Sequence, residues 1–251
     1  MKKSLAAVVI LLMIHQGVRA QMVSSNVLQR VFQIKHDDML GTAFTIDVDG
    51  RQYVITARHV VSKIGDAGEI QIRRETEWLS LPVKAFFPTA RSIDIAVLAP
   101  EVQVSQPLPL HTRSTYYLSQ DVYCCGFPYG LSMEGKKINA GFPIPFVKKG
   151  VVAALGVPDN EGQEVVVLDA INNPGFSGGP VVLQDTQTHQ LAVIGVVSSF
   201  RFQEDKVIAE GKETGMTVRS NTGLTIVYPT KAALDVIHAH RVGFELHEER
   251  K

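Results

Sequence analysis

The sequence predicts an all-β protein that ends in one short helix. Short runs rich in valine, isoleucine, threonine and aromatic residues recur along the chain at the usual length of strands. Asp49 and Gly50 stand between two of these runs and form a strong hairpin signal, because glycine accepts the positive φ of a two-residue turn. Helical periodicity is confined to the last part of the chain.

The runs that carry the strand signal are each bounded by turn residues or polar stretches. They cover residues 42–48, 52–61, 93–100, 151–157, 164–170, 180–184 and 191–200. The segment at residues 99–113 interrupts them with prolines and polar residues, which divides the chain into two halves. The most polar interior stretch, residues 201–221, is predicted to be a long exposed loop between two strands, and long loops in compact domains are often functional.

The predicted helix covers residues 229–241. Pro229 and Thr230 suit its start, and Ala233, Val236 and Ile237 fall on one side at helical spacing. We therefore expect the helix to pack this apolar side against the β body.

Composition narrows the class of partner. The chain has 251 residues, of which 45% are hydrophobic and 20% charged, so it can bury a sizeable core. Lys plus Arg and Asp plus Glu each number 25. This balance gives no overall field that favours nucleic acid or an anionic membrane, and we expect protein or peptide partners instead.

The first twenty residues have the pattern of a signal peptide. Lys2 and Lys3 precede an apolar run at residues 5–14, and Val18 and Ala20 occupy the small-residue positions of a cleavage site. The apolar run is too short to span a bilayer, although an uncleaved anchor or a buried helix is the alternative interpretation. We expect an exported protein, periplasmic or secreted, with no stable membrane anchor after cleavage at residue 20.

The cysteines do not form a disulfide framework. Cys124 and Cys125 are adjacent, and their Cα atoms are about 3.8 Å apart, below the usual range for a disulfide. We expect two thiols on a strand. No metal or redox partner for them is evident, and the sequence predicts neither a metal site nor a cofactor.

The stretch "NNPGFSGGPVV", residues 172–182, surrounds Ser177 with residues that allow unusual backbone turns. A serine hydroxyl becomes a good nucleophile only when a base takes its proton, and the resulting oxyanion needs hydrogen-bond donors already in place. Gly175 permits a sharp turn that aims its own N–H and that of Ser177 into one space. The alternative is a glycine-rich strand turn with an incidental serine.

Two further residues favour the catalytic interpretation. His59 lies at the end of the apolar run "VITARHVV", and Asp94 lies among apolar neighbours in "SIDIAVLAP". A buried aspartate can hold an imidazole in the tautomer that accepts a proton from serine. The order His, Asp, Ser in these contexts is hard to obtain by chance.

These segments resemble the chymotrypsin-like serine proteases, and within them the HtrA (Deg) branch of bacteria. The resemblance runs from residue 41 to residue 229 through "GTAFTID", "YVITARHVV", "DIAVL", "GFPYGL", "NPGFSGGPVV", "IGVV" and "GLTIVYP". It implies two six-stranded β-barrels with the site in the cleft between them. The first barrel is expected in residues 22–112 and the second, with the terminal helix, in residues 113–241.

The resemblance also implies a role for each matching residue. His59 is the general base, Asp94 the orienting acid and Ser177 the nucleophile, while the amides of Gly175 and Ser177 form the oxyanion hole. The expected function is that of an exported serine endopeptidase. The alternatives are a chaperone-like or binding protein on a protease fold with a weakly active site, and an esterase that uses the same triad.

The chain departs from the HtrA pattern in the serine loop. Phe176 stands where these enzymes usually carry asparagine, and Asn172 where an aliphatic residue is usual. Trypsin-like zymogens carry an aspartate before the serine to pair with a new N-terminus, a pair that Phe176 cannot form. Few residues follow the terminal helix, so no peptide-binding PDZ module is expected.

The resemblance places the floor of the specificity pocket at Ile171 and its wall in the strand with Val197, Ser198 and Ser199. A buried lysine or arginine of a substrate needs an acid at the floor, which Ile171 does not supply. Its branched side chain also occupies the depth that a large aromatic ring requires. We expect cleavage after small or medium aliphatic residues.

Overall fold

The computed structural model describes residues 22–107, 110–185 and 188–247. The predicted signal peptide lies outside these residues. Among the described residues, the two α-helices are α2 (Ser25–Leu28) and α3 (Thr230–Ala239). The 3-10 helices are η1 (Arg58–Val61), η2 (Pro128–Gly130) and η3 (Lys136–Asn139). None of the described helices has the length and apolar character needed to cross a membrane.

The remaining regular structure is β. The strands among the described residues are β1 (Val31–His36), β2 (Met39–Val48), β3 (Arg51–Thr56), β4 (Ala67–Arg74), β5 (Glu77–Phe86), β6 (Ala96–Pro100), β7 (His111–Thr112), β8 (Asp121–Gly126), β9 (Phe146–Pro158), β10 (Glu164–Asp169), β11 (Pro180–Gln184), β12 (Leu191–Ala209), β13 (Lys212–Pro229) and β14 (Phe244–Glu245).

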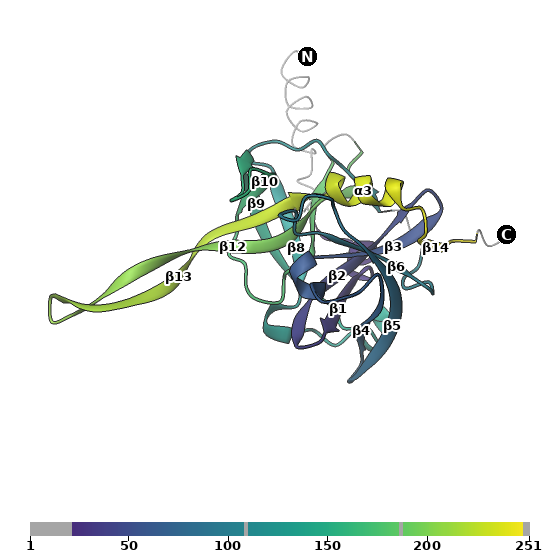
Figure 1. The fold of residues 1–251 in the computed structure, drawn as a ribbon, viewed down its shortest axis with the longest axis horizontal. Helices are drawn as coiled ribbons and strands as arrows, with labels where there is room; N and C mark the ends of the chain where they lie inside the picture. The colour runs from purple at the N-terminus through teal and green to yellow at the C-terminus, as the bar shows by residue number, and fades with distance from the viewer. Residues whose placement is uncertain (1–21, 108–109, 186–187, 248–251) are drawn as a thin grey trace, which may run out of the picture.

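The strands form two closed barrels (Figure 1). In the first, the order β3-β2-β1-β4-β5-β6 is closed by pairing of β3 with β6, and β14 adds to β3. In the second, the order β11-β8-β9-β10-β13-β12 is closed by pairing of β11 with β12, and β7 adds to β12. The predicted fold class, two six-stranded β-barrels with a short C-terminal helix, is confirmed.

The hairpin predicted at Asp49 and Gly50 joins β2 to β3. Val48 pairs with Arg51 across the turn, and the φ angles of Asp49 and Gly50 are 50° and 72°. Both turn residues therefore lie in the left-handed region that the tightest hairpins require.

Apolar residues of the strands form one core inside each barrel and a third between them. The third cluster contains Phe44 and Ile55 of the first barrel together with Val182 and Val193 of the second. This shared core fixes the two barrels against each other, and thereby fixes the positions of side chains that extend from either barrel into the cleft.

Helix α3 confirms the prediction for the end of the chain, since Ala233, Val236 and Ile237 are buried in the core between the barrels. The domain bounds differ slightly from those predicted. Strand β7 at residues 111–112 pairs with β12 of the second barrel, and β14, beyond residue 241, returns to β3 of the first. Isolated two-residue strands carry no periodicity by which the sequence could reveal them.

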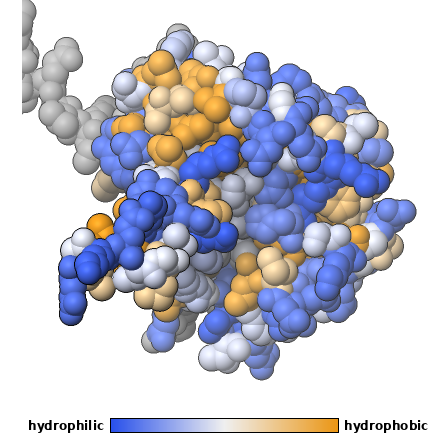
Figure 2. Space-filling view, turned by 60° about the vertical axis from the view of Figure 1, so that its left-hand side comes forward, coloured by the Kyte–Doolittle hydropathy of each residue, from blue (hydrophilic) through white to orange (hydrophobic). Residues whose placement is uncertain are grey.

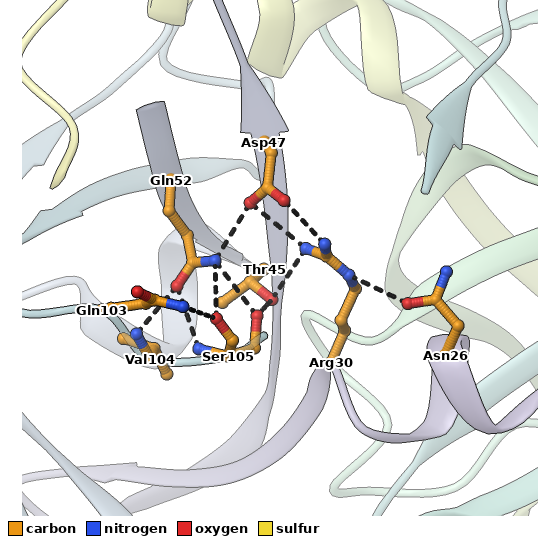
Figure 3. A network of polar contacts seen from close by, with 8 residues as sticks. All are labelled: Asn26, Arg30, Thr45, Asp47, Gln52, Gln103, Val104 and Ser105. Carbon is orange, nitrogen blue, oxygen red and sulfur yellow. Dashed lines mark hydrogen bonds and ion pairs between the residues drawn. The ribbon is translucent and has the colours of Figure 1, made fainter. Parts of the chain in front are cut away.

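A polar network is buried at one end of the first barrel (Figure 3). The guanidinium of Arg30, only 1% exposed, donates to both carboxylate oxygens of Asp47 at 3.2 and 2.6 Å. Gln52 donates to Asp47 at 3.0 Å and accepts from the amides of Val104 and Ser105. The network joins β2 and β3 to the segment after β6 and satisfies groups that are costly to bury unpaired.

We expect Asp47→Ala to lower the free energy of unfolding by about 3–5 kcal/mol, because it leaves the buried guanidinium of Arg30 without its carboxylate. Urea unfolding followed by circular dichroism measures the change. The matched control is the double variant Arg30→Met with Asp47→Leu, which removes both charges and should recover part of the loss. Equal stability of Asp47→Ala and the unmodified chain would contradict this account.

Residues 201–221 are not a loop, which corrects the prediction. They form the outer part of β12 and β13, a long two-stranded hairpin that extends away from the barrels (Figure 1). We call residues 201–221 the arm. Its turn at Glu210 and Gly211 has φ angles of 50° and 76°. Nearly all arm side chains are at least partly exposed, so the strands lack the apolar alternation that marks a half-buried strand in a sequence.

The two cysteines are free, buried thiols on β8. Burial raises the pKa of Cys124 to about 12, and the nearby charge of Lys148 opposes this shift. Burial also raises the pKa of Cys125. Both thiols therefore remain protonated at neutral pH and serve as small core residues.

Candidate active site

His59 and Asp94 meet in the first barrel. His59 belongs to η1, the 3-10 turn directly after β3, whose Val60 and Val61 are buried and anchor it. Asp94 precedes β6, which pairs with β3. Asp94 Oδ2 lies 2.7 Å from His59 Nδ1, and Oδ1 accepts the backbone N–H of His59 at 2.9 Å. The carboxylate thus fixes both the ring and the main chain of the histidine.

This contact determines which ring nitrogen of His59 is available. An ionised carboxylate only accepts hydrogen bonds, so Nδ1 of the neutral ring carries the proton and Nε2 is left as the acceptor. The His59 side chain is 41% exposed, whereas that of Asp94 is 17% exposed. A covered acid behind an accessible imidazole is the arrangement needed for a general base.

Ser198 of β12 connects this pair to Ser177. Its hydroxyl donates to Asp94 Oδ2 at 2.6 Å, and its backbone carbonyl accepts from the hydroxyl of Ser177 at 3.1 Å. The three residues predicted as a triad are therefore brought to one place, at the junction of the two barrels. In this structure the hydroxyl of Ser177 faces the carbonyl of Ser198, and no hydrogen bond joins it to His59 among the described residues.

The loop before Ser177 leaves two backbone amides without an acceptor among the described residues. The carbonyl of Pro174 accepts the N–H of Tyr129 at 2.7 Å, so the Gly175 N–H of the same trans peptide points the opposite way. Gly175 has a φ of 101°, and a Cβ there would lie 2.1 Å from the carbonyl oxygen of Phe127. Among the described residues, neither Gly175 nor Ser177 has an acceptor for its amide. Both donors can therefore serve an oxyanion.

Thr42 of β2 ties the serine loop to the first barrel. Its hydroxyl donates to the carbonyl of Gly175 at 2.6 Å, and its N–H donates to the carbonyl of Ser177 at 2.8 Å. Gly178 permits this approach, since a Cβ there would lie 2.1 Å from the Thr42 carbonyl oxygen, and its φ is 86°. The glycine after the serine is thus required by close contact between the barrels.

Phe176 is fully buried in the core of the second barrel, with an exposed fraction of 0%. Its ring lies against Gly126, where an added Cβ would meet a ring carbon at 2.8 Å. Burial of a ring of this size stabilises the folded state by about 1.5–3 kcal/mol. The residue before the serine is therefore anchored by apolar packing.

Lys148 of β9 supports the loop from its other side, a role that no sequence motif indicated. Its ammonium donates to the carbonyl of Ile171 at 2.9 Å and to the side-chain oxygen of Asn173, and lies 5.0 Å from the centre of the Phe176 ring. Burial lowers the pKa of Lys148. Asn221, at the base of the arm, donates to the carbonyl of Asn172 at 2.6 Å.

The residues expected to form the specificity pocket differ in how far they are exposed to solvent. The Ile171 side chain is 62% exposed, while its backbone is held by Lys148. Ser199 is exposed, whereas Ser198 is 6% exposed and faces Asp94. Val197 is buried, and its N–H and carbonyl bind Gly179 and Gly178. The side chain of Val197 is thus packed in the core, and its backbone groups hold the serine loop.

No group of three or more His, Cys, Asp or Glu side chains is placed to hold a metal ion within residues 22–107, 110–185 and 188–247.

Similar folds occur in solved proteases. The HtrA-type protease AlgW, solved as a serine-to-alanine variant with a tripeptide, is 20% identical, with a TM-score of 0.58 over 86% of this chain and 63% of that chain. This chain therefore spans less than two thirds of the AlgW chain. The Rv3671c protease in its inactive form is 20% identical, with a TM-score of 0.54 over 87% of this chain and 91% of that one.

A variant of Rv3671c from M. tuberculosis H37Rv, also in an inactive form, is 18% identical, with a TM-score of 0.52 over 86% of this chain and 88% of that chain. At these identities the likeness establishes the fold. A comparison with curated proteins found no match. Residues 41–196, more than half of the sequence, match the family described as the trypsin-like peptidase domain. The chain belongs to the trypsin-like peptidase domain family.

Proposed function

We propose that this protein is an exported serine endopeptidase that hydrolyses peptide bonds through His59, Asp94 and Ser177. The observation that carries the proposal is the position of Ser198, which binds Asp94 with its hydroxyl and Ser177 with its carbonyl. Through this one residue, Asp94, the imidazole that it orients and Ser177 lie in a continuous arrangement.

The proposed reaction begins when the Ser177 hydroxyl turns from the Ser198 carbonyl toward His59. Nε2 of His59 takes the hydroxyl proton while Oγ bonds to the substrate carbonyl carbon, and the carbonyl electrons move to its oxygen. The amides of Gly175 and Ser177 stabilise this oxyanion. Collapse breaks the C–N bond, and the imidazolium gives its proton to the leaving amine. Water then hydrolyses the acyl-enzyme with the same base.

One observation favours a second candidate, a chaperone-like or binding protein with a weakly active site. The Ser177 hydroxyl donates to Ser198 and not to His59 in the structure. Were this arrangement retained with substrate, the chain would bind polypeptides without cleaving them.

A fluorophosphonate probe tests the proposal. We expect stoichiometric labelling of the purified protein, localised to Ser177 by mass spectrometry, together with cleavage of a proteome-derived peptide library. Binding of peptides without labelling or cleavage would favour the second candidate. Hydrolysis of simple esters but of no peptide would indicate an esterase instead.

We further propose cleavage after small or medium aliphatic residues such as valine, alanine, isoleucine or leucine. Ile171 presents an exposed apolar side chain on a backbone fixed by Lys148, and offers no charge for a basic residue. We expect Ile171→Gly to raise kcat/KM for peptides with phenylalanine before the scissile bond by about tenfold. The peptide library measures the change, with Leu224→Ala on β13 as a control. Dominant cleavage after arginine or lysine would contradict the assignment.

Export is proposed from residues 1–20 alone. We expect mass spectrometry of the secreted or periplasmic protein to find an N-terminus at Gln21, because signal peptidase cleaves after the small residue Ala20. Expression of a chain that lacks residues 2–20 is the control and should leave the protein inside the cell. An intact Met1 on membrane-bound protein would indicate an anchor.

A further inference from the structure

The arm begins at the candidate active site. Strand β12 passes Ser198, whose carbonyl faces Ser177, and continues without interruption to Ala209 near the tip of the arm. At about 3.4 Å per residue, the strand carries its edge on the order of 30 Å beyond the site. The arm is therefore a direct extension of the strand that borders the reactive serine.

One edge of β12 is uncovered along this length. On its other edge β12 pairs with β13 from Gly195 to Ala209. On the edge that faces the site, pairing with β11 ends at Val196, and Val197 is the last residue to bond the serine loop. Beyond Val197, no strand among the described residues pairs with this edge.

The uncovered edge presents regularly spaced donors and acceptors. Successive residues of a strand turn their backbone groups to opposite edges. The pairing of β12 with β13 keeps one register from Phe202 to Lys206. On either side of this run, the carbonyls of Arg201 and Val207 face β13 and accept from the side-chain hydroxyls of Thr222 and Thr214 at 2.8 and 2.9 Å. Within the run, the N–H and C=O groups that face outward therefore belong to Phe202, Glu204 and Lys206.

A groove of about 450 Å³ lies where the arm leaves the barrel. It is bordered by residues 198–202 of β12, by Ile226 and Tyr228 of β13, by Ser92 and by the β9–β10 turn at residues 159–161. An extended chain that left the site beside Ser198 would pass this groove before it reached the arm.

The arm is held as a ribbon by its own side chains. Arg219 donates to Glu204 at 3.2 Å and lies 4.4 Å from the centre of the Phe202 ring, while Lys206 donates to Glu213. On the face seen in Figure 2, the projecting arm is coloured mainly as hydrophilic. A two-stranded ribbon is only marginally stable in water, and a third strand would stabilise it.

We propose that the outward edge of the arm, from Phe202 to Ile208, binds a distant N-terminal part of a polypeptide substrate as an added antiparallel strand. The inference rests on the proposed function. Backbone pairing of this kind accepts many sequences, because main-chain hydrogen bonds supply the affinity. The arm therefore selects substrates with a long extended segment before the cleaved bond.

The polarity follows from the sheet. Apart from the pairing with β7, every strand pair of the second sheet is antiparallel. Since β12 runs away from Ser177, an antiparallel partner runs toward it and reaches the site with its C-terminal end. Residues N-terminal to the scissile bond consequently lie along the arm.

The test uses internally quenched peptides of alternating threonine and valine, with fluorophore and quencher on either side of one cleaved bond. A short peptide ends opposite Phe200, a second extends N-terminally far enough to reach Ile208, and a third is extended by the same length C-terminally. We expect the N-terminal extension alone to raise kcat/KM, by on the order of tenfold or more.

The decisive variant is Glu204→Pro, which removes an outward N–H without removing a bond to β13. Its matched control is Arg219→Pro. Arg219 lies directly opposite Glu204 on β13, so either proline variant removes the same side-chain contact between these two residues. The N–H that Arg219→Pro removes faces the outer edge of β13, on the opposite side of the arm. We expect Glu204→Pro to abolish the preference for the long peptide and Arg219→Pro to retain it, while both variants cleave the short peptide and accept the fluorophosphonate normally.

Each contrary result has a distinct meaning. The inference would be overturned by equal cleavage of all three peptides, by equal loss in both proline variants, or by a preference for the C-terminal extension. In each of these cases, fluorophosphonate labelling of Ser177 would still support the proposed function. Sedimentation of the unmodified protein as a dimer that Glu204→Pro dissociates would assign the edge to a second copy, and would also overturn it. Absence of both labelling and cleavage would remove the proposed function and the inference with it.

Discussion

Replacement of Ser177 by alanine is expected to abolish acyl-enzyme formation and fluorophosphonate labelling. Without the hydroxyl, His59 has no nucleophile to activate, and any remaining acceleration of about 10³–10⁴ over water comes from binding and the oxyanion amides. Burst kinetics and mass spectrometry of the trapped intermediate measure the loss.

Ser80→Ala is a suitable control for Ser177→Ala, since Ser80 is an exposed serine on β5 of the first barrel. It should be labelled and should turn over substrate like the unmodified protein. Peptidase activity that survived in the Ser177 variant would refute the proposed mechanism.

Asp94→Asn is expected to lower kcat by on the order of 10⁴ with little change in fold. The carboxylate accepts hydrogen bonds from His59 Nδ1, from the His59 backbone and from Ser198. An amide in its place presents a donor toward the ring, which favours the tautomer with the proton on Nε2 and leaves no base for Ser177. Steady-state kinetics on a valine-containing peptide measures the effect.

Ser198→Ala serves as a comparison for Asp94→Asn, because we expect it to lower kcat by a smaller factor. It removes one of the hydrogen bonds to Asp94 but retains the carbonyl that binds Ser177, so its effect on kcat should be much smaller, about tenfold. A loss in Ser198→Ala that equalled the loss in Asp94→Asn would show that Asp94 acts mainly through the serine hydroxyl and not through the histidine.

The barrels could be predicted from the sequence because most of their strands bury at least one side. The runs around Phe44, Val166 and Val182 carry apolar residues that the structure places in the cores. Asp49 and Gly50 favour their turn through their own backbone preferences, and the spacing of the apolar residues in α3 predicts which side of the helix is buried. In each of these cases the determinant lies within a few neighbouring residues.

The arm could not be predicted because both of its faces meet solvent. Phe202, Ile208, Met216 and Val218 are all more than a third exposed, and the polar residues between them follow no period that separates a ribbon from a loop. Its turn at residues 210–211 lacks the asparagine or aspartate that marks the commonest tight hairpins.

The supports of the serine loop escaped prediction for another reason. Thr42 and Lys148 reach Gly175 and Ile171 across long stretches of chain, and Asn221 reaches Asn172 from the base of the arm. Such contacts exist only once the barrels have assembled, and no local spacing encodes them. The motif around Ser177 predicted the candidate reactive atoms, whereas the tertiary structure determines what holds them in place.

The buried ring of Phe176 gives the serine loop an anchor that ionic strength does not weaken. A charge pair at this position would be screened as salt rises, whereas apolar burial is maintained or strengthened by sulfate and phosphate. The same anchor loses strength on cooling, because hydrophobic stabilisation declines at low temperature. The amides of Gly175 and Ser177 should therefore keep their geometry in concentrated salt and lose it first in the cold.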